Sequence, residues 1–264
     1  MTDAGADRTT GETEDAAHLS LYDDAALYDA QYRHYRDDLP FYRELALDRP
    51  GEVLEVGAGS GRVTVELARL AERVVGLEPS APMRAAAARR LDAAGLAARV
   101  ELRDQDVRTL DEEGRYALII APFHALMHLP TLSDQDVALG AIRRALAPGG
   151  AFACDVATPP READAALRHV DGWREPDGGQ AELFVVQRDH AAEQRLESLY
   201  LLDVTDAEGR VVRRRRQLVQ RTFHRFELER ALRGAGFDTV RLFGDFDRRP
   251  VEPEGTRLVA LATV

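Results

Sequence analysis

The sequence predicts an α/β protein with a mostly parallel sheet that helices cover on both faces. Short apolar runs alternate with helical stretches from about Gly51 to Ala157, and this alternation returns after about Glu227. Strands that are separated by helices imply right-handed crossovers and parallel pairing. Between the two stretches lie long strand-like runs without helices. We therefore expect a doubly wound α/β domain with an antiparallel β insertion and an N-terminal helical cap.

The N-terminal residues divide into a tail and a cap. Residues 1–17 are rich in Gly, Thr, Asp and Glu and have almost nothing to bury, so we expect them to be disordered. Residues 18–48 carry apolar and aromatic side chains at helical spacing. This pattern predicts one or two amphipathic helices that are interrupted near Pro40.

The core comprises residues 49–160 and 224–264 in our prediction. Its strands are expected where apolar residues run together: 52–56, 73–78, 98–103, 116–121, 151–157, 239–244 and 257–263. Its helices are expected where apolar residues recur with helical periodicity: 60–70, 80–94, 133–147 and 227–233. Gly95 is a stop signal for the second of these helices, and Ser133 and Asp136 have capping-box spacing at the start of the third.

The insertion comprises residues 161–223. A short helix over 162–169 and a loop rich in Gly, Pro and Asp lead into three predicted strands, which are 181–190, 195–206 and 211–223. The sequence DAEGR at 206–210 predicts a hairpin turn between the last two strands. Arg213–Arg216 would place side chains on alternating faces of a strand, so we interpret this run as a solvated edge.

Composition excludes several classes of protein. The chain has 264 residues, of which 45% are hydrophobic and 31% charged, and its net charge is −11. Such a chain buries a core without disulfides, and an acidic field disfavours nucleic acids and anionic membranes. The single cysteine, Cys154, excludes an internal disulfide framework, and the chain contains no lysine for Schiff-base chemistry. The polar N-terminus resembles no secretory signal, so we expect a cytoplasmic protein.

A glycine-rich segment between a predicted strand and a predicted helix indicates ligand binding. It reads Glu55-Val56-Gly57-Ala58-Gly59-Ser60-Gly61. Glycines allow a tight turn and a close approach of the backbone to a ligand, and a helix N-terminus offers free N–H groups. A dinucleotide fingerprint needs G-x-G-x-x-G, but its third glycine would fall on Arg62. Glu55 lies two residues before the first glycine, and an acid there favours a cationic ligand over a pyrophosphate.

Five segments in order resemble the motifs of the class I methyltransferases, the Rossmann-like family that uses S-adenosylmethionine. They are VLEVGAGSGR, Glu78 at the end of the second strand, Asp106 in LRDQDVR, IIAPFHALMHL and LAPGGAF. The resemblance covers about residues 50–157 and resumes at ERALRGAGF. It implies a seven-stranded sheet, S-adenosylmethionine as the cofactor and S-adenosylhomocysteine as the product.

The resemblance also implies a set of cofactor-binding residues. Glu78 would hold the ribose hydroxyls, and Asp106 would bind the adenine amino group beside the backbone N–H of Val107. Core packing is the alternative role for Met83 and Phe123. The full set is Glu55, Gly57, Ala58, Gly59, Gly61, Glu78, Met83, Asp106, Val107 and Phe123.

Two histidines follow the fourth predicted strand, where ligand crevices of α/β sheets lie. His124 and His128 have the i, i+4 spacing of one helical face, and we predict catalytic roles for both, His128 first. FHALMH is similar to the segment FSSIGH of deoxyamino-sugar N-methyltransferases, whose last residue faces the acceptor. Because no HExxH motif or nearby acid completes a ligand set, we expect no metal.

Further substrate-binding candidates come from both ends of the chain. In many small-molecule members of the family an N-terminal helix brings aromatic residues to the acceptor, and Tyr22, Tyr28 and Tyr32 stand in that region. Core packing is the alternative for each tyrosine. His224 and Arg225 follow the insertion and would border the acceptor pocket.

The leading hypothesis is a methyltransferase that acts on N or O of a small molecule, such as a natural-product or amino-sugar intermediate. One alternative is an RNA or protein methyltransferase, but the net charge of −11 and APFH in place of an N/D-P-P-Y/F tetrapeptide argue against RNA. Another is a non-catalytic or NAD-binding Rossmann protein, which Arg62 disfavours. We expect no nucleic-acid or membrane partner, and the insertion would serve as a substrate lid or a homodimer contact.

Overall fold

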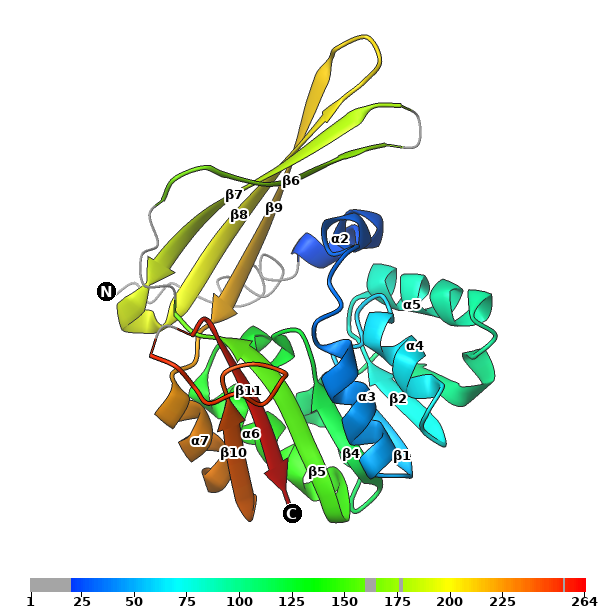
Figure 1. The fold of residues 1–264 in the computed structure, drawn as a ribbon, viewed down its shortest axis with the longest axis vertical. Coiled ribbons are helices and arrows are strands. Elements are labelled where there is room, and N and C mark those ends of the chain that lie inside the picture. Colours follow the sequence, from blue (N-terminus) through cyan, green and yellow to red (C-terminus); the bar gives the residue numbers. More distant parts are fainter. Residues whose placement is uncertain (1–19, 160–164, 176–177, 254) are drawn as a thin grey trace, which may run out of the picture.

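The computed structural model describes residues 20–159, 165–175, 178–253 and 255–264, and it contains two separate β-sheets. A seven-stranded sheet forms the core, and a four-stranded sheet rises above one end of it (Figure 1). The predicted fold class is confirmed. The expected disordered tail, residues 1–17, lies outside the described residues.

The core sheet has the strand order β10-β11-β5-β4-β1-β2-β3. Its strands are β1 (Glu52–Val56), β2 (Arg73–Leu77), β3 (Val100–Arg103), β4 (Tyr116–Ala121), β5 (Leu146–Ala157), β10 (Thr239–Phe243) and β11 (Arg257–Thr263). The first five strands pair in parallel, whereas β11 runs antiparallel to both β5 and β10. Because the chain moves outward from β1 to β3 and then returns to β4, the carboxyl ends of β1 and β4 form a switch point where a crevice is expected.

Helices cover both faces of the core sheet. The α-helices of the core are α3 (Leu39–Asp48), α4 (Arg62–Ala68), α5 (Ala81–Ala93), α6 (Leu132–Ala145) and α7 (Arg225–Gly234). Leu45 of α3 and Leu67 of α4 belong to one buried apolar cluster, while Ile142 of α6 and Leu228 of α7 belong to the other. None of the helices within the described ranges is long and apolar enough to cross a membrane.

Two predictions about helix boundaries need correction: the interruption near Pro40 and the N-cap of α6. Pro40 does not interrupt a helix but lies in the first turn of α3, where its missing N–H costs nothing. The break precedes it, between α2 (Ala25–Gln31) and Asp38. Helix α6 is capped by Thr131 rather than Ser133, because the Thr131 side chain accepts the backbone N–H of Asp134 at 3.0 Å.

The insertion forms a fully antiparallel sheet in the order β6-β7-β8-β9. Its strands are β6 (Arg168–Arg174), β7 (Gln180–His190), β8 (Arg195–Thr205) and β9 (Val211–Arg221). The hairpin predicted at 206–210 is present, since the N–H of Asp206 donates to the carbonyl of Arg210 at 3.0 Å. The Arg213–Arg216 run lies on β9 at the edge of this sheet, as predicted.

Strand β6 was not predicted, and the helix expected over 162–169 is wrong in its described part. Residues 168 and 169 already pair with β7, and residues 165–167 form no regular structure. The sequence of β6 is mostly polar and contains a glycine. Its apolar contact with the insertion comes from Trp173, which packs against Ala181 and Leu202. Pairing with β7 therefore overrides the weak local preference of this segment.

The N-terminal segment joins the two sheets. Leu27 of α2 packs into the apolar cluster of the insertion with Leu183, while Ala25 packs against Met83 of α5. Arg33 forms an ion pair with Asp171 of β6 at 2.7 Å. Figure 1 shows α2 between the insertion sheet and α5. The N-terminal segment therefore contacts both the core and the insertion.

A buried ion pair attaches this segment to the core near Asp38. Asp38 is fully buried, and both of its carboxylate oxygens accept hydrogen bonds from Arg62 at 2.6 Å. The Arg62 guanidinium also stacks over the rings of Tyr35 and Phe123. A buried charge of this kind depends on its partner, because removal of either leaves the other desolvated and unpaired.

We expect Arg62→Met to lower the free energy of unfolding by about 3–5 kcal/mol, because Asp38 would remain buried without a counter-ion. The matched control is Arg69→Met at the other end of the same helix, since Arg69 pairs with Glu66 but its side chain is 50% exposed. That variant should lose at most about 1 kcal/mol. Urea denaturation measures both, and equal losses would contradict a special role for the Asp38–Arg62 pair.

Candidate functional site

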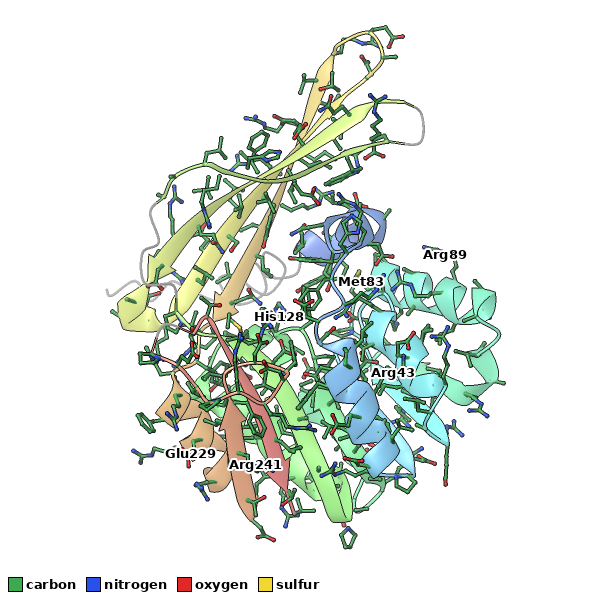
Figure 2. The ribbon with its side chains drawn as sticks, viewed as in Figure 1. Arg43, Met83, Arg89, His128, Glu229 and Arg241 are labelled. Carbon is green, nitrogen blue, oxygen red and sulfur yellow. The ribbon has the colours of Figure 1, made fainter. Side chains whose placement is uncertain are left out.

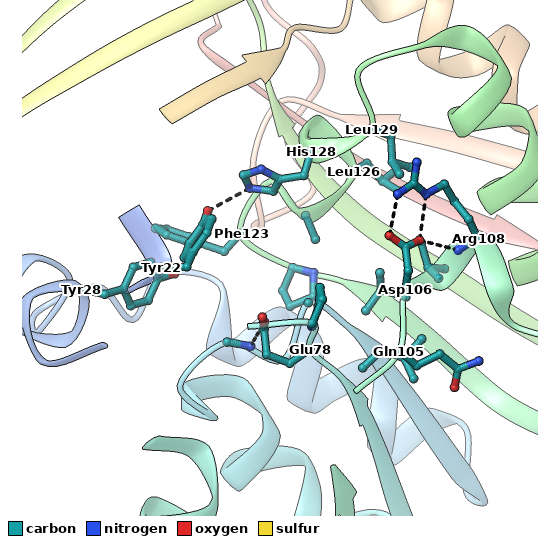
Figure 3. A pocket seen from close by; sticks show the side chains of 18 residues that line it. Tyr22, Tyr28, Glu78, Gln105, Asp106, Arg108, Phe123, Leu126, His128 and Leu129 are labelled. Atoms are coloured by element: carbon teal, nitrogen blue, oxygen red, sulfur yellow. Dashed lines mark hydrogen bonds and ion pairs between the residues drawn. The ribbon is translucent and has the colours of Figure 1, made fainter. Parts of the chain in front are cut away.

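A cavity opens at the carboxyl ends of β1, β2 and β4 (Figure 3). Its walls come from the glycine-rich loop, the end of β2, the segment after β3, the segment after β4 and the N-terminal segment. The lining residues are Tyr22, Tyr28, Val56, Gly57, Gly59, Leu77, Glu78, Pro79, Gln105, Asp106, Val107, Arg108, Pro122, Phe123, Ala125, Leu126, His128 and Leu129. The cavity therefore lies at the switch point of the sheet, where ligands of open α/β folds bind.

The glycine-rich loop follows β1 and presents its backbone to the cavity. Gly57 and Gly59 line the cavity with φ angles of +71° and +57°, a backbone region that other residues rarely adopt. Ala58 faces away and is buried, and its N–H donates to the carbonyl of Leu77 at 2.9 Å. Gly61 lies outside the lining, and a Cβ there would stand 3.1 Å from Ala87 of α5. Two of the predicted loop residues thus face the cavity, and two shape the loop.

Glu78 is the buried acid of the cavity wall. Its carboxylate accepts the backbone N–H of Gly59 and that of Ser80, both at 2.8 Å, and the residue is 8% exposed. Burial raises the pKa of Glu78, and the two backbone donors partly offset this effect. The carboxylate is held in one orientation at the side of the glycine-rich loop, with acceptor capacity left for hydroxyl groups of a ligand.

Glu55, in contrast, does not line the cavity. Its carboxylate points toward α4 and accepts a hydrogen bond from the Thr64 hydroxyl at 2.6 Å. Burial raises the pKa of Glu55 to about 8, against which the Thr64 hydrogen bond acts. Its charge was expected to favour a cationic ligand, but at neutral pH this residue is largely protonated. Glu78 is the carboxylate that faces the cavity.

Asp106 and Val107, which were predicted to bind adenine, line the opposite end of the cavity. Asp106 accepts hydrogen bonds from the Arg108 backbone N–H at 2.8 Å and from its Nη2 at 2.9 Å (Figure 3). Arg108 also reaches Asp134 of α6 at 2.7 Å. Sequence reasoning missed Arg108 and Gln105. The signal for Arg108 was its position two residues after an aspartate, a spacing that suits a side chain-to-backbone turn.

Phe123 and Met83 were both predicted to contact a cofactor, and they differ. Phe123 lines the cavity, and its ring packs against Tyr32 and Tyr35 at centroid distances of 4.7 and 4.9 Å. Met83 is fully buried on α5, where it packs against Ala25 of α2 (Figure 2). Met83 therefore has the core-packing role that was the alternative.

A tyrosine–histidine pair closes one side of the cavity. The Tyr22 hydroxyl and His128 Nε2 are 2.9 Å apart, and their rings meet edge to face (Figure 3). Burial raises the pKa of Tyr22 well above its usual value, so its hydroxyl stays protonated. Tyr28 also lines the cavity, whereas Tyr32 stands behind it, against the rings of Tyr28 and Phe123.

Three further predicted substrate-side residues do not line the cavity. His124 has a left-handed φ of +65° and precedes the 3-10 helix η4 (Ala125–His128), so it does not share a helical face with His128. Its Nε2 instead lies 3.5 Å from Asp155, and burial lowers the pKa of its imidazole. His224 caps α7 together with Glu227. Arg225 stacks over the exposed ring of Phe226.

A second cavity lies between η4 and the insertion sheet. It is lined by Met127, His128, Pro130, Glu193, Arg195, Glu197, Gln217, Val219, Gln220 and Arg221. His128 is therefore common to both cavities. In the described part of the chain, no group of three or more His, Cys, Asp or Glu side chains is arranged to hold a metal ion.

Comparisons with known proteins bear on the domain and on the fold. Residues 53–150 match the family described as “Methyltransferase domain”. An uncharacterized methyltransferase from Geobacillus kaustophilus is 32% identical over 149 residues, which are 56% of this chain and 63% of that protein. The match thus spans less than two thirds of the curated relatives.

Two solved structures extend the likeness to the whole fold. The CcbJ methyltransferase from Streptomyces caelestis is 26% identical, with a TM-score of 0.75 over 92% of this chain and 97% of that one. S-adenosylmethionine-bound CalS10, an amino pentose methyltransferase from Micromonospora echinaspora, is 22% identical, with a TM-score of 0.68 over 100% of this chain and 99% of that one. The second comparison bears on the fold alone.

Glu55 generates a prediction about pH and stability. Its pKa is about 8 in the folded chain, against 4.5 for an exposed glutamate. Between these values the folded chain holds a proton that the unfolded chain has released, so stability falls as pH rises. Relative to Glu55→Gln, the wild type should lose up to about 1.4 kcal/mol per pH unit across this window. Urea denaturation at pH 5 and pH 8 measures the free energy of unfolding of both proteins. If this free energy changes equally with pH in the wild type and in Glu55→Gln, Glu55 is not buried in its protonated form.

Proposed function

We propose that this chain, which carries a methyltransferase domain with the Rossmann-like class I fold, transfers a methyl group from S-adenosylmethionine to N or O of a small molecule. The resemblance found in the sequence is confirmed at the level of the domain and the fold. The observation that carries the proposal is the cavity at the switch point, in which Gly59 and Glu78 lie at one side and Asp106 at the other.

The cavity residues suit the polar groups of this cofactor. Glu78 would accept hydrogen bonds from the ribose hydroxyls, because its carboxylate is fixed by two backbone donors and faces the cavity. The turn at Gly57 and Gly59 would pass along the amino-acid portion. Asp106 and the Val107 backbone would receive the adenine, and Arg108 fixes the Asp106 carboxylate.

The cofactor supplies an activated methyl group on a sulfonium, so the protein's task is to position the acceptor and to handle a proton. His128 is the candidate for this task, because it lines the cavity beyond η4 and is oriented by Tyr22. Tyr22 and Tyr28 add an aromatic wall that suits a cationic amine. We expect His128 mainly to orient the acceptor.

The remaining parts of the proposal concern setting and partners. We propose a cytoplasmic enzyme for a natural-product or amino-sugar intermediate, without a nucleic-acid partner, supported by the net charge of −11. The insertion, residues 161–223, would act as a lid over the acceptor, since Arg33 and Leu27 connect it to the N-terminal segment. A homodimer contact through the same sheet is compatible with the lid.

Glu78→Ala should weaken binding of S-adenosylhomocysteine by about 10–150-fold, because it removes charge-assisted hydrogen bonds worth roughly 1.5–3 kcal/mol. Asp104→Ala is the control, since Asp104 lies two residues before Asp106 with a side chain that is 71% exposed. Calorimetric titration measures both. Unchanged affinity in a folded Glu78→Ala variant would remove the ribose assignment.

His128→Ala should raise KM for the acceptor while cofactor affinity changes little, because the side chain orients the acceptor and not the cofactor. Acceptors are found by a mass gain of one methyl group. His169→Ala is the control and should leave this KM unchanged, since His169 lies on β6 with a side chain that is 53% exposed and lines neither cavity. A general base would behave differently: kcat would fall about 10²–10⁴-fold and the acidic limb of the pH profile would vanish.

A further inference from the structure

The second cavity has an unusual wall on the insertion side. Arg195 of β8 and Arg221 of β9 are directly opposite each other in the antiparallel register, so their side chains leave the same face of the sheet. Like charges in this arrangement repel each other and weaken strand pairing. The Arg195–Arg221 pair therefore lowers the stability of the β8–β9 pairing. Both residues line the second cavity, which His128 also lines.

Neither arginine is fully satisfied by the protein. Arg195 reaches Glu193 at 3.1 Å through Nη2, and Arg221 reaches Glu227 at 3.3 Å and Gln194 at 3.0 Å through its own Nη2. The Nε–H groups of both are shielded from solvent and have no hydrogen-bond acceptor within the described ranges. Buried donors of this kind are rare, because each costs free energy until an acceptor is supplied.

The other charged groups around this cavity are already engaged. Glu197 accepts a hydrogen bond from Gln217 at 2.9 Å, and its second oxygen lies 3.4 Å from His190 Nε2. Glu193 carries the ion pair with Arg195. Each guanidinium group therefore keeps an Nε–H donor that no acceptor of the described residues uses.

The arginine pair is connected to the reacting end of the site. Arg221 Nη1 lies 3.5 Å from the carbonyl of Pro130, two residues after His128. His128 in turn lines the cavity that we assign to the cofactor. A small molecule that fills the second cavity would thus have the arginines and His128 among its neighbours.

We propose that the second cavity is the acceptor subsite and that Arg195 and Arg221 bind an anionic oxygen group of the acceptor, a carboxylate or a phosphoryl group. This inference rests on the proposed function and names its substrate class. Guanidinium groups bind both kinds of oxyanion through paired N–H donors. The methylated atom lies at the other end of the acceptor, beside His128.

The test is a calorimetric titration of the full chain, saturated with S-adenosylhomocysteine, with inorganic phosphate and with acetate at constant ionic strength. We expect saturable binding of at least one anion, weakened about tenfold or more in Arg195→Gln and in Arg221→Gln. Tighter binding of phosphate would identify a phosphoryl group, and tighter binding of acetate a carboxylate. Arg213→Gln is the matched control, because Arg213 lies on β9 but is exposed and paired with Asp203.

Two outcomes would overturn the proposal: no saturable binding of either anion, or an equal loss in Arg213→Gln. Arg221 also holds Glu227 of α7, so the more exposed Arg195 gives the variant that is safer for folding. Titration of each variant with S-adenosylhomocysteine distinguishes a failure of the anion-binding proposal from a failure of the proposed function. If that compound fails to bind the wild type, the proposed function fails, while the anion titration without it still tests the arginine pair.

Discussion

The fully buried carboxylate of Asp155 fixes the turn that positions Phe123 at the cavity. Asp155, near the end of β5, accepts hydrogen bonds from the Tyr42 hydroxyl at 2.7 Å and from the Phe123 N–H at 2.8 Å. The second bond holds a turn in which Phe123 and His124 both have left-handed φ angles, of +53° and +65°. Such a turn is strained for residues other than glycine and persists only when its surroundings fix it. It directs the Phe123 ring into the cavity wall and starts the 3-10 helix that carries His128.

The same turn explains why the N-terminal segment covers the site. The Phe123 ring gives Tyr28, Tyr32 and Tyr35 an apolar surface, and Arg62 stacks over this ring while it pairs with Asp38. Arg62 occupies the position of the third glycine in a dinucleotide fingerprint. In this chain that position anchors the cap, so the departure from the fingerprint has a structural purpose.

Much of the fold could be predicted from the sequence because its signals are local. Strands β4 and β11 were predicted with their observed bounds, since continuous apolar runs end at turn residues. Strand β6 could not be predicted, because its mostly polar, glycine-containing sequence lacks the apolar pattern of a strand and the strand is stabilised by pairing with β7. The same limit applies to the site. Glu78 and Asp106 were placed by their spacing, but the side chain direction of Glu55 and His124 depends on Thr64 and Asp155, which local sequence does not reveal.

The position of the insertion gives the two cavities different chemistry. The first lies within the core, and its polar groups come from loops that the sheet holds rigidly at the switch point. The second is lined partly by β8 and β9 of the insertion, and Arg221 of β9 also contacts Glu227 of α7 and the carbonyl of Pro130 in the core. On the proposed function, cofactor binding, which requires the same geometry for every acceptor, would use the wall formed by the core, and acceptor binding would use residues of the insertion. His128, at the boundary, belongs to the core but faces both. On the proposed function, substrate choice would depend on residues of the insertion, which lie outside the matched residues 53–150.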